Sequence, residues 1–268
     1  MINTRAIGIG KIGYALGRGE SLRELMRRAV DRLIDEGGAR QEIGGVIAAS
    51  FSGERRFPSL AVETAKYLAL PGNVTAFDLQ MACSAYPYAI YLAGRMSEDL
   101  GKKVLVIDGD VQSRLVDEND HATGKIFSDA VTASVVGVHE GGESRWDFLS
   151  DYDEALECGE GGPIKMDGMS VFTFVATKVA KFLKTFIGND GGFYFVPHQA
   201  NAYMVRQLAK TLGCEDRLLI LPEEMKNPGS ASIPLTMALE PKKSGRMLIA
   251  GFGAGYSAGA GMIYREEN

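Results

Sequence analysis

The chain has 268 residues, 46% of them hydrophobic and 24% charged, which suffices for a large folded core and excludes a disordered polypeptide. Its formal net charge of -5 at pH 7 argues against a nucleic-acid-binding protein, which needs a positive surface. We expect no membrane span, because no apolar run reaches about 18 residues, and the N-terminus has no secretory pattern. Cys83, Cys158 and Cys214 form neither CxxC nor Cys/His clusters, so we expect no disulfide framework, no metal site and a reducing, cytoplasmic setting.

The first half alternates strand-like runs with amphipathic helical patterns, which is typical of an α/β architecture. A first strand is followed by a helix that starts with a capping box, Ser21 and Glu24. Further strands are predicted at GGVIAASF, VTAFDLQM, KKVLVIDGD and AVTASVVGVH, with helices over about 59–70 and from Ser84.

The pattern starts again after a polar, glycine-bearing stretch over about 140–168, to which we assign no helix or strand. A helix is predicted at VFTFVATKVAKFLKTF, followed by a strand at FYFVPH, a helix over about 202–212 and a strand at RLLIL. A helix from about Ser230 and strands at RMLIAGF and AGAGMIY complete this part. The repetition predicts two successive α/β halves, residues 1–145 and 146–268.

Three glycines near the N-terminus, Gly8, Gly10 and Gly13, match the GxGxxG pattern of dinucleotide-binding proteins. The glycines of that pattern must lie between a strand and the start of a helix. The residues that directly follow, YALGRGE, are no helix start, so we do not interpret the pattern as a nucleotide site.

Cys83 is the first candidate for chemistry, because FDLQMACSAYPYAI places it between a buried strand and a helix with Pro87 in its first turn. The positive end of the helix dipole favours a thiolate there, so we expect a lowered pKa for Cys83. The alternative is a structural cysteine, because free cysteine is among the residue types most often buried.

His198 supports the catalytic alternative, because VPHQAN places it at the end of a strand in the second half, where Cys83 stands in the first. Ligand sites in α/β sheets lie at the carboxyl ends of strands. Asn227, in KNPGSASIPLTMAL, precedes a helix in the same half, although Asn-Pro-Gly is also an ordinary turn sequence. Together the three residues supply a nucleophile and two hydrogen-bonding groups for acyl transfer through a thioester.

Four segments resemble, in order and spacing, the signature blocks of the β-ketoacyl-[acyl carrier protein] synthase III family: ACSAYPYAI, VPHQAN, NPGSASIP and GFGAGYSAG. MDGMSVF and IFSDAVTASVV are also similar to segments of that family, and the likeness runs from about Pro58 onward. The resemblance implies a thiolase-like fold, with two pseudo-duplicated α/β halves in a layered αβαβα arrangement.

The resemblance also implies residue roles. Cys83 would carry the acyl group, and the backbone N–H groups of Cys83 and Ala254 would form the oxyanion hole. His198 and Asn227 would bind the malonyl thioester carbonyl during a decarboxylative Claisen condensation. The pantetheine arm would be lined by Asn201, Met166, Gly168 and Phe172.

The family implies acyl-CoA or acyl-carrier-protein primers, malonyl carrier protein as extender, no bound cofactor and a homodimer. The segment between the first strand and GGVIAASF is shorter than is typical of the family, where it holds a clamp for the adenine of coenzyme A. A carrier-bound primer is therefore the more attractive expectation. The basic residues of the first helix, Arg23, Arg27, Arg28 and Arg32, would suit an acidic carrier, although ordinary surface charge explains them as well.

Two other functions are compatible with the same residues. The acyl-Cys83 intermediate could pass its acyl group to an oxygen, nitrogen or sulfur acceptor. Alternatively, the chain could be a non-catalytic partner in a heterocomplex with another ketosynthase. His121, in an acidic loop, is interpreted as an exposed loop residue, and Cys158 and Cys214 as incidental.

Overall fold

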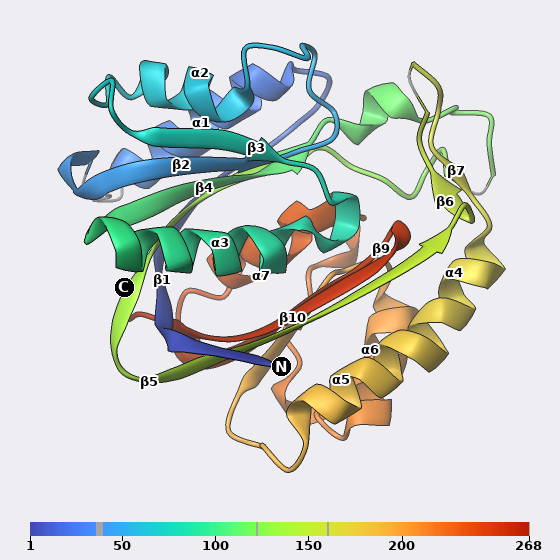
Figure 1. Cartoon of the computed structure of the whole chain (residues 1–268). Coiled ribbons are helices and arrows are strands. Elements are labelled where there is room, and N and C mark those ends of the chain that lie inside the picture. Colours follow the sequence, from blue (N-terminus) through green and yellow to red (C-terminus); the bar gives the residue numbers. More distant parts are fainter. Residues whose placement is uncertain (36–39, 122, 160, 268) are drawn as a thin grey trace.

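The computed structural model describes residues 1–35, 40–121, 123–159 and 161–267. Figure 1 shows the predicted thiolase-like arrangement, in which helices and sheet regions alternate in five layers. Hydrogen bonds join the main strands in the order β3-β2-β4-β5-β1-β10-β9-β8, with an additional pairing of β5 and β10.

The first sheet region and its outer helices come from the N-terminal half. Its strands are β1 (Ile2–Leu16), β2 (Ile43–Ala49), β3 (Thr75–Leu79), β4 (Lys103–Asp110) and the start of β5 (Ala130–Asp153). The outer helices are α1 (Leu22–Asp35) and α2 (Leu60–Tyr67). The predicted capping box of α1 is present, because the Glu24 N–H donates to Ser21 Oγ at 3.2 Å.

The second sheet region comes from the C-terminal half, with strands β8 (Tyr194–Pro197), β9 (Gly245–Gly253) and β10 (Gly255–Arg265). Its outer layer contains α4 (Gly168–Phe174), α5 (Ala180–Ile187) and α6 (Ala202–Leu212). A small hairpin of β6 (Leu156–Glu157) and β7 (Lys165–Met166) lies near the edge. Among the residues that the structure describes, none of the helices combines the length and the apolar composition that a membrane-spanning segment needs.

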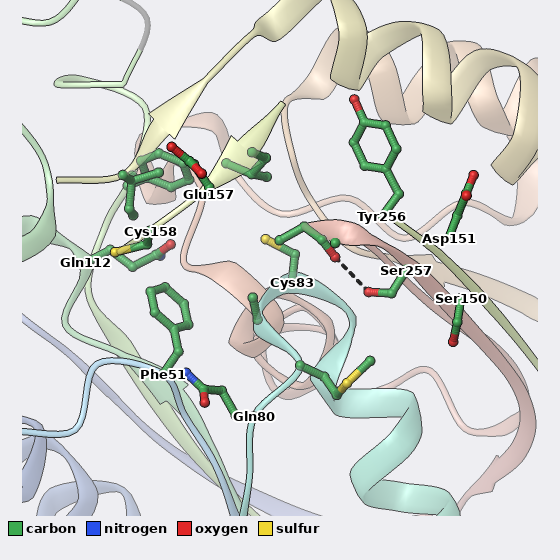
Figure 2. Close-up of a pocket in the computed structure, with 17 residues that line it drawn as sticks. Phe51, Gln80, Cys83, Gln112, Ser150, Asp151, Glu157, Cys158, Tyr256 and Ser257 are labelled. Carbon is green, nitrogen blue, oxygen red and sulfur yellow. Dashed lines mark hydrogen bonds between the residues drawn. The ribbon is translucent and has the colours of Figure 1, made fainter. Parts of the chain in front are cut away.

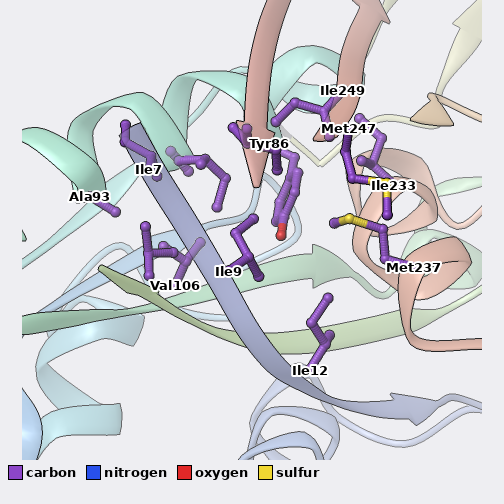
Figure 3. Close-up of a cluster of buried hydrophobic side chains, with 14 of the residues drawn as sticks. Ile7, Ile9, Ile12, Tyr86, Ala93, Val106, Ile233, Met237, Met247 and Ile249 are labelled. Atoms are coloured by element: carbon purple, nitrogen blue, oxygen red, sulfur yellow. The ribbon is translucent and has the colours of Figure 1, made fainter. Parts of the chain in front are cut away.

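The middle layer consists of α3 (Ala85–Leu100) and α7 (Ser232–Leu239), which lie between the two sheet regions (Figure 1). Both helices are buried on more than one face, and their side chains join a single cluster with residues of both sheet regions. Figure 3 shows Tyr86 of α3 and Met237 of α7 in this cluster, beside Ile9 of β1 and Ile249 of β9. Burial between two sheets explains why these helices are apolar on most sides.

Strand β5 extends beyond the strand predicted at AVTASVVGVH, into the polar stretch that was assigned no element. The strand continues to Asp153 through Gly141 and Gly142, both with positive φ. Its first part pairs with β4 and β1, and its last part pairs with β10. The predicted division between residues 145 and 146 falls inside this strand.

Two further predictions need adjustment. RLLIL forms no strand of the main sheet; Leu218 makes only an isolated bridge to Phe195. The single helix predicted at VFTFVATKVAKFLKTF is α4 and α5 joined by one π-helical turn, Val175–Val179. The other predicted helices and strands are present, with small shifts at their ends.

The GxGxxG glycines all lie inside β1, so the absence of a following helix start is confirmed. A Cβ atom at Gly13 would lie 2.1 Å from the Ala29 carbonyl oxygen of α1. Gly13 therefore permits the close packing of α1 on β1.

Candidate active site

Cys83 lies in a 3-10 turn (Ala82–Ser84) that joins the end of β3 to the start of α3. The preceding residue, Ala82, has a φ of 40°, in the region that non-glycine residues seldom adopt. The thiol is nearly buried, with 6% of Cys83 exposed. The predicted position between strand and helix is confirmed, but the strand is not buried, because every residue of β3 is exposed or half-buried.

Two glycines of β9 fix the space around Cys83. A Cβ at Gly253 would lie 2.9 Å from Cys83 Cβ and 3.4 Å from Sγ, and Gly253 has a φ of 151°. A Cβ at Gly251 would lie 2.9 Å from Pro87 Cδ and 3.1 Å from the Cys83 carbonyl oxygen. Contacts under 3.0 Å force the neighbouring atoms to shift, so β9 approaches Cys83 as closely as it does only because these residues lack side chains.

The first of two cavities at Cys83 has a volume of about 370 Å³ (Figure 2). Its wall includes Phe51 and Gln112 on one side and Tyr256 and Ser257 on the other, and Phe127 also lines it. The Ser257 hydroxyl donates to the Ala254 carbonyl oxygen at 2.8 Å, which fixes the turn between β9 and β10.

The second cavity has a volume of about 350 Å³ and brings the predicted trio together, since Cys83, His198 and Asn227 all line it. Its remaining wall is largely apolar, with Phe252 of β9 and Val175 of the π-helical turn among its members. Cys83 borders both cavities and is therefore accessible from two directions.

The expectation of a lowered Cys83 pKa is wrong. Burial raises the pKa of this thiol to about 12, and the Asp110 carboxyl group adds to the shift. Backbone hydrogen bonds from Ala254 and from Cys83 itself lower the pKa but do not compensate for burial. The resting group is therefore a thiol, with the two predicted oxyanion-hole N–H groups directed at its sulfur.

His198 follows β8 and is 2% exposed. Burial lowers the pKa of its imidazole to about 4, so the ring is neutral at physiological pH. Its Nδ1 lies 3.0 Å from the Gly229 carbonyl oxygen and 3.0 Å from Ser232 Oγ. Since Nδ1 is occupied, Nε2 is the ring nitrogen that remains for a ligand in the cavity.

Asn227 is fixed through its backbone and its side-chain oxygen. Its carbonyl oxygen accepts from the Ser128 N–H and from Gln112 Nε2, both at 3.0 Å. Its Oδ1 accepts from the Gly229 N–H at 3.0 Å. The amide nitrogen Nδ2 is thus left to donate into the second cavity, which suits the predicted binding of a carbonyl oxygen.

The predicted pantetheine residues divide into two groups. Met166, Gly168 and Asn201 line the second cavity. Asn201 also caps α6, because its Oδ1 accepts from the Met204 N–H at 2.8 Å. Phe172 lies outside this lining and stacks on Tyr203, with the ring centroids 6.3 Å apart.

Sequence reasoning missed several residues near Cys83. Cys158 lines the first cavity, and His121, although exposed as predicted, lines the second. Gln112 and Ser232 hold Asn227 and His198 in place. Ser232 lies in the NPGSASIP block, which was a usable signal, whereas Gln112 carries no local pattern.

Two buried carboxyl groups at the end of β4, Asp108 and Asp110, were also missed. Burial raises the pKa of both. Asp108 accepts a hydrogen bond from Ser230, and Asp110 accepts three, from the Ser50 hydroxyl and the N–H groups of Phe51 and Ser52. Each carboxyl group keeps one buried oxygen without a partner.

The basic residues of α1 are already engaged within the chain. Arg23 forms an ion pair with Glu63 at 2.7 Å, and Arg28 pairs with Glu20 at 2.9 Å. The Arg32 guanidinium lies 3.8 Å from the ring centroid of Tyr14. These contacts support the interpretation of α1 as an ordinary charged surface.

Comparison with known sequences gives two matching segments that together include more than half of the chain. Residues 77–151 match the family model for 3-oxoacyl-[acyl-carrier-protein] synthase III, and residues 193–265 match its C-terminal model. A β-ketoacyl-[acyl-carrier-protein] synthase III from Neisseria meningitidis is 28% identical over 279 residues, covering 94% of this chain and 87% of the relative. One from Rhizorhabdus wittichii is 29% identical over 276 residues, covering 93% and 86%.

Solved structures agree in fold. A 3-oxoacyl-(acyl-carrier protein) synthase from Burkholderia xenovorans superimposes with a TM-score of 0.90 at 23% identity, covering 99% of this chain and 96% of the other. The priming β-ketosynthase of the R1128 polyketide pathway gives a TM-score of 0.89 at 22% identity, with coverages of 98% and 97%. Together with the two matching segments, one of which contains Cys83 and the other His198, these findings show that the chain belongs to the 3-oxoacyl-[acyl-carrier-protein] synthase III family of condensing enzymes.

Proposed function

We propose that this chain is a condensing enzyme that carries an acyl group on Cys83 and joins it to a malonyl thioester. The observation that carries the proposal is the position of Cys83 between two cavities, one of which also contains His198 and Asn227. One cavity offers space for the acyl chain, while the other admits the extender thioester.

In the first half-reaction, the Cys83 sulfur attacks the thioester carbonyl of the primer. The new carbon–sulfur bond forms as the bond to the donor thiol breaks, and the proton lost by Cys83 ends on that thiol. The backbone N–H groups of Cys83 and Ala254, which lie at the sulfur, are suited to hold the negative carbonyl oxygen of the tetrahedral intermediate. Because the resting thiol is protonated, proton removal belongs to this half-reaction.

In the second half-reaction, the malonyl thioester loses carbon dioxide and becomes an enolate. Donors from His198 Nε2 and Asn227 Nδ2 would stabilise the negative oxygen. The enolate carbon then attacks the acyl carbonyl on Cys83, the carbon–sulfur bond breaks, and the released thiolate takes up a proton. The products are a β-ketoacyl thioester, carbon dioxide and the free thiol.

The proposed substrates are an acyl thioester of coenzyme A or of an acyl carrier protein, and malonyl carrier protein. The relatives are named for action on acyl carrier protein, which supports that partner. No bound cofactor is needed, because both half-reactions use only protein groups and the substrates. A homodimer and a cytoplasmic location are part of the proposal, and the three free cysteines fit a reducing compartment.

The test is intact-protein mass spectrometry after separate mixing with acyl-coenzyme A and acyl-carrier donors. We expect the wild type to gain the mass of one acyl group, and the Cys83→Ala variant to gain none. Addition of malonyl carrier protein should then remove the acyl mass and yield a β-ketoacyl product.

Two outcomes would overturn the proposal. Without labelling of the wild type by either donor, the partner-subunit alternative replaces it. If the acyl group leaves Cys83 for a hydroxyl, amine or thiol acceptor and no malonyl-derived product forms, the chain is an acyltransferase of another kind.

A further inference from the structure

His198 has two partners at the same ring nitrogen, and only one of them is compatible with a ring proton on Nε2. The Gly229 carbonyl oxygen, 3.0 Å from Nδ1, can only accept, so it requires a proton on Nδ1. The Ser232 hydroxyl, also 3.0 Å away, can donate as well as accept. A neutral imidazole carries one N–H, so the partner that prevails decides whether Nε2 is a donor or an acceptor.

The hydrogen bonds of Ser232 leave its proton available for His198. Its Oγ already accepts from the Gln199 N–H at 3.1 Å, so one of its lone pairs is occupied while the O–H is not. Ser232 is 0% exposed, so water does not compete for this hydrogen. Among the described residues, the hydroxyl is the one assigned partner of Nδ1 that is able to donate to it.

We propose that Ser232 is a positioning residue that sets the tautomer of His198: by donating to Nδ1, it places the ring proton on Nε2, facing the cavity shared with Cys83 and Asn227. In this tautomer His198 donates to the malonyl thioester oxygen as the enolate forms. Without the hydroxyl, the Gly229 carbonyl oxygen holds the proton on Nδ1. Nε2 then presents a lone pair, and not an N–H, to the malonyl thioester oxygen. Ser232 would therefore matter for decarboxylation and not for acylation of Cys83.

The role in decarboxylation rests on the proposed function, whereas the tautomer does not. The first measurement is therefore spectroscopic. The chain has three histidines, so the ring nitrogens of protein labelled with ¹⁵N-histidine give few signals, and a His198→Gln variant identifies those of His198. Long-range ¹H–¹⁵N correlations near neutral pH report which ring nitrogen carries the proton.

We expect the wild type to show the proton on Nε2 and Ser232→Ala to show it on Nδ1. Ser232→Thr, which keeps the hydroxyl, should restore the wild-type pattern. Ser230→Ala is the matched control, because Ser230 is an equally buried serine two residues away whose hydroxyl donates to Asp108. It should leave the His198 signals unchanged.

The second measurement separates the half-reactions. In Ser232→Ala, malonyl decarboxylation should slow by about 100-fold, the order expected when one charge-stabilising donor is lost. Acylation of Cys83 should change by less than about twofold, a small effect on the barrier. A thermal unfolding curve for each variant shows that it is folded.

The proposal is overturned if the His198 signals of Ser232→Ala match those of the wild type, or if the wild type carries its proton on Nδ1. If Ser232→Ala does not fold, the spectra of the wild type and of Ser232→Thr still test the proposal. A His198 proton on Nδ1 in either protein contradicts the assignment. A wild type that shows the Nε2–H tautomer but decarboxylates no malonyl thioester would count against the proposed function and leave the tautomer assignment intact.

Discussion

Cys83 and His198 line the same cavity but are held in place by different means. Cys83 is fixed by close packing, with the side-chain-free backbone of Gly253 against its Cβ and sulfur. His198 is fixed by hydrogen bonds to Gly229 and Ser232, and its neighbour Asn227 by bonds to Gln112 and Gly229.

The difference corresponds to the role proposed for each group. A nucleophile must reach one carbon atom from one direction, and steric contacts define such a position tightly. A group that stabilises charge needs a defined proton position, which only hydrogen-bond partners can supply. The site therefore has a packed side, Cys83, and a hydrogen-bonded side, His198 and Asn227. The two sides should respond differently to substitution and to pH.

The largest effect is expected where close packing is broken. Gly253→Ala places a Cβ 2.9 Å from Cys83 Cβ at a φ of 151°, so either β9 or the Cys83 turn must move. A displacement of this kind should slow acylation of Cys83 by about 100-fold. The rate is measured by rapid-quench mass spectrometry.

Gly10→Ala is the matched control for Gly253→Ala. It is also a strand glycine, but its Cβ would lie 3.4 Å from the flexible Glu266 carboxylate. Acylation by this variant should match the wild type. Equal rates for Gly253→Ala and the wild type would show that packing does not position Cys83.

The second-largest effect is expected from pH, which should change the rate of acylation but not the rate of decarboxylation. Because the pKa of Cys83 is raised to about 12, the thiolate fraction rises about tenfold per pH unit between pH 7 and 9, and acylation should rise with it. His198 has a pKa of about 4, so its protonation does not change over this range, and malonyl decarboxylation should be nearly constant. Single-turnover rates of each half-reaction provide the comparison.

Parallel pH profiles for the two half-reactions would contradict this separation. A flat acylation profile would mean that the Cys83 proton leaves together with bond formation, so that the resting pKa does not govern the rate. The rate of thioester hydrolysis without enzyme is measured at each pH and subtracted from the rate with enzyme.

The smallest effect is expected from a change at Gln112, which supports Asn227 on the hydrogen-bonded side. Gln112 is 1% exposed and donates to the carbonyl oxygens of Ser128 and Asn227, both at 3.0 Å. Gln112→Leu leaves both oxygens without this donor and should lower the free energy of unfolding by about 2 kcal/mol. Decarboxylation should fall more than acylation, because Asn227 lies on that side.

Urea unfolding measures the stability change, with Gln207→Leu as control because Gln207 is exposed on α6. The control should stay within about 0.5 kcal/mol of the wild type. An equal loss of both half-reactions in Gln112→Leu would indicate general loosening of the site and not a specific displacement of Asn227.

The sequence by itself predicted most helices and strands, because apolar periodicity and caps act within a few residues. The capping box of α1 and the position of Cys83 between β3 and α3 are of this kind. Residue types and positions, and then the family resemblance, grouped Cys83, His198 and Asn227 in the sequence analysis, and the structure places them around one cavity.

The tertiary structure alone decided the properties that depend on distant residues. The helix-end argument gave the wrong direction for the Cys83 pKa, because burial between β9 and α3 outweighs a local dipole. The stretch after residue 140 is strand because β10 pairs with it, and RLLIL is not, because it gains only one bridge to β8.

The contacts of Gln112 with Asn227 and of Ser232 with His198 span 115 and 34 residues of sequence. Local patterns carry no information about such pairs, since propensity and periodicity describe neighbours along the chain. The sequence thus determined which groups are available for chemistry, while folding determined their protonation and their partners, because both depend on burial and on residues brought together only in the folded chain.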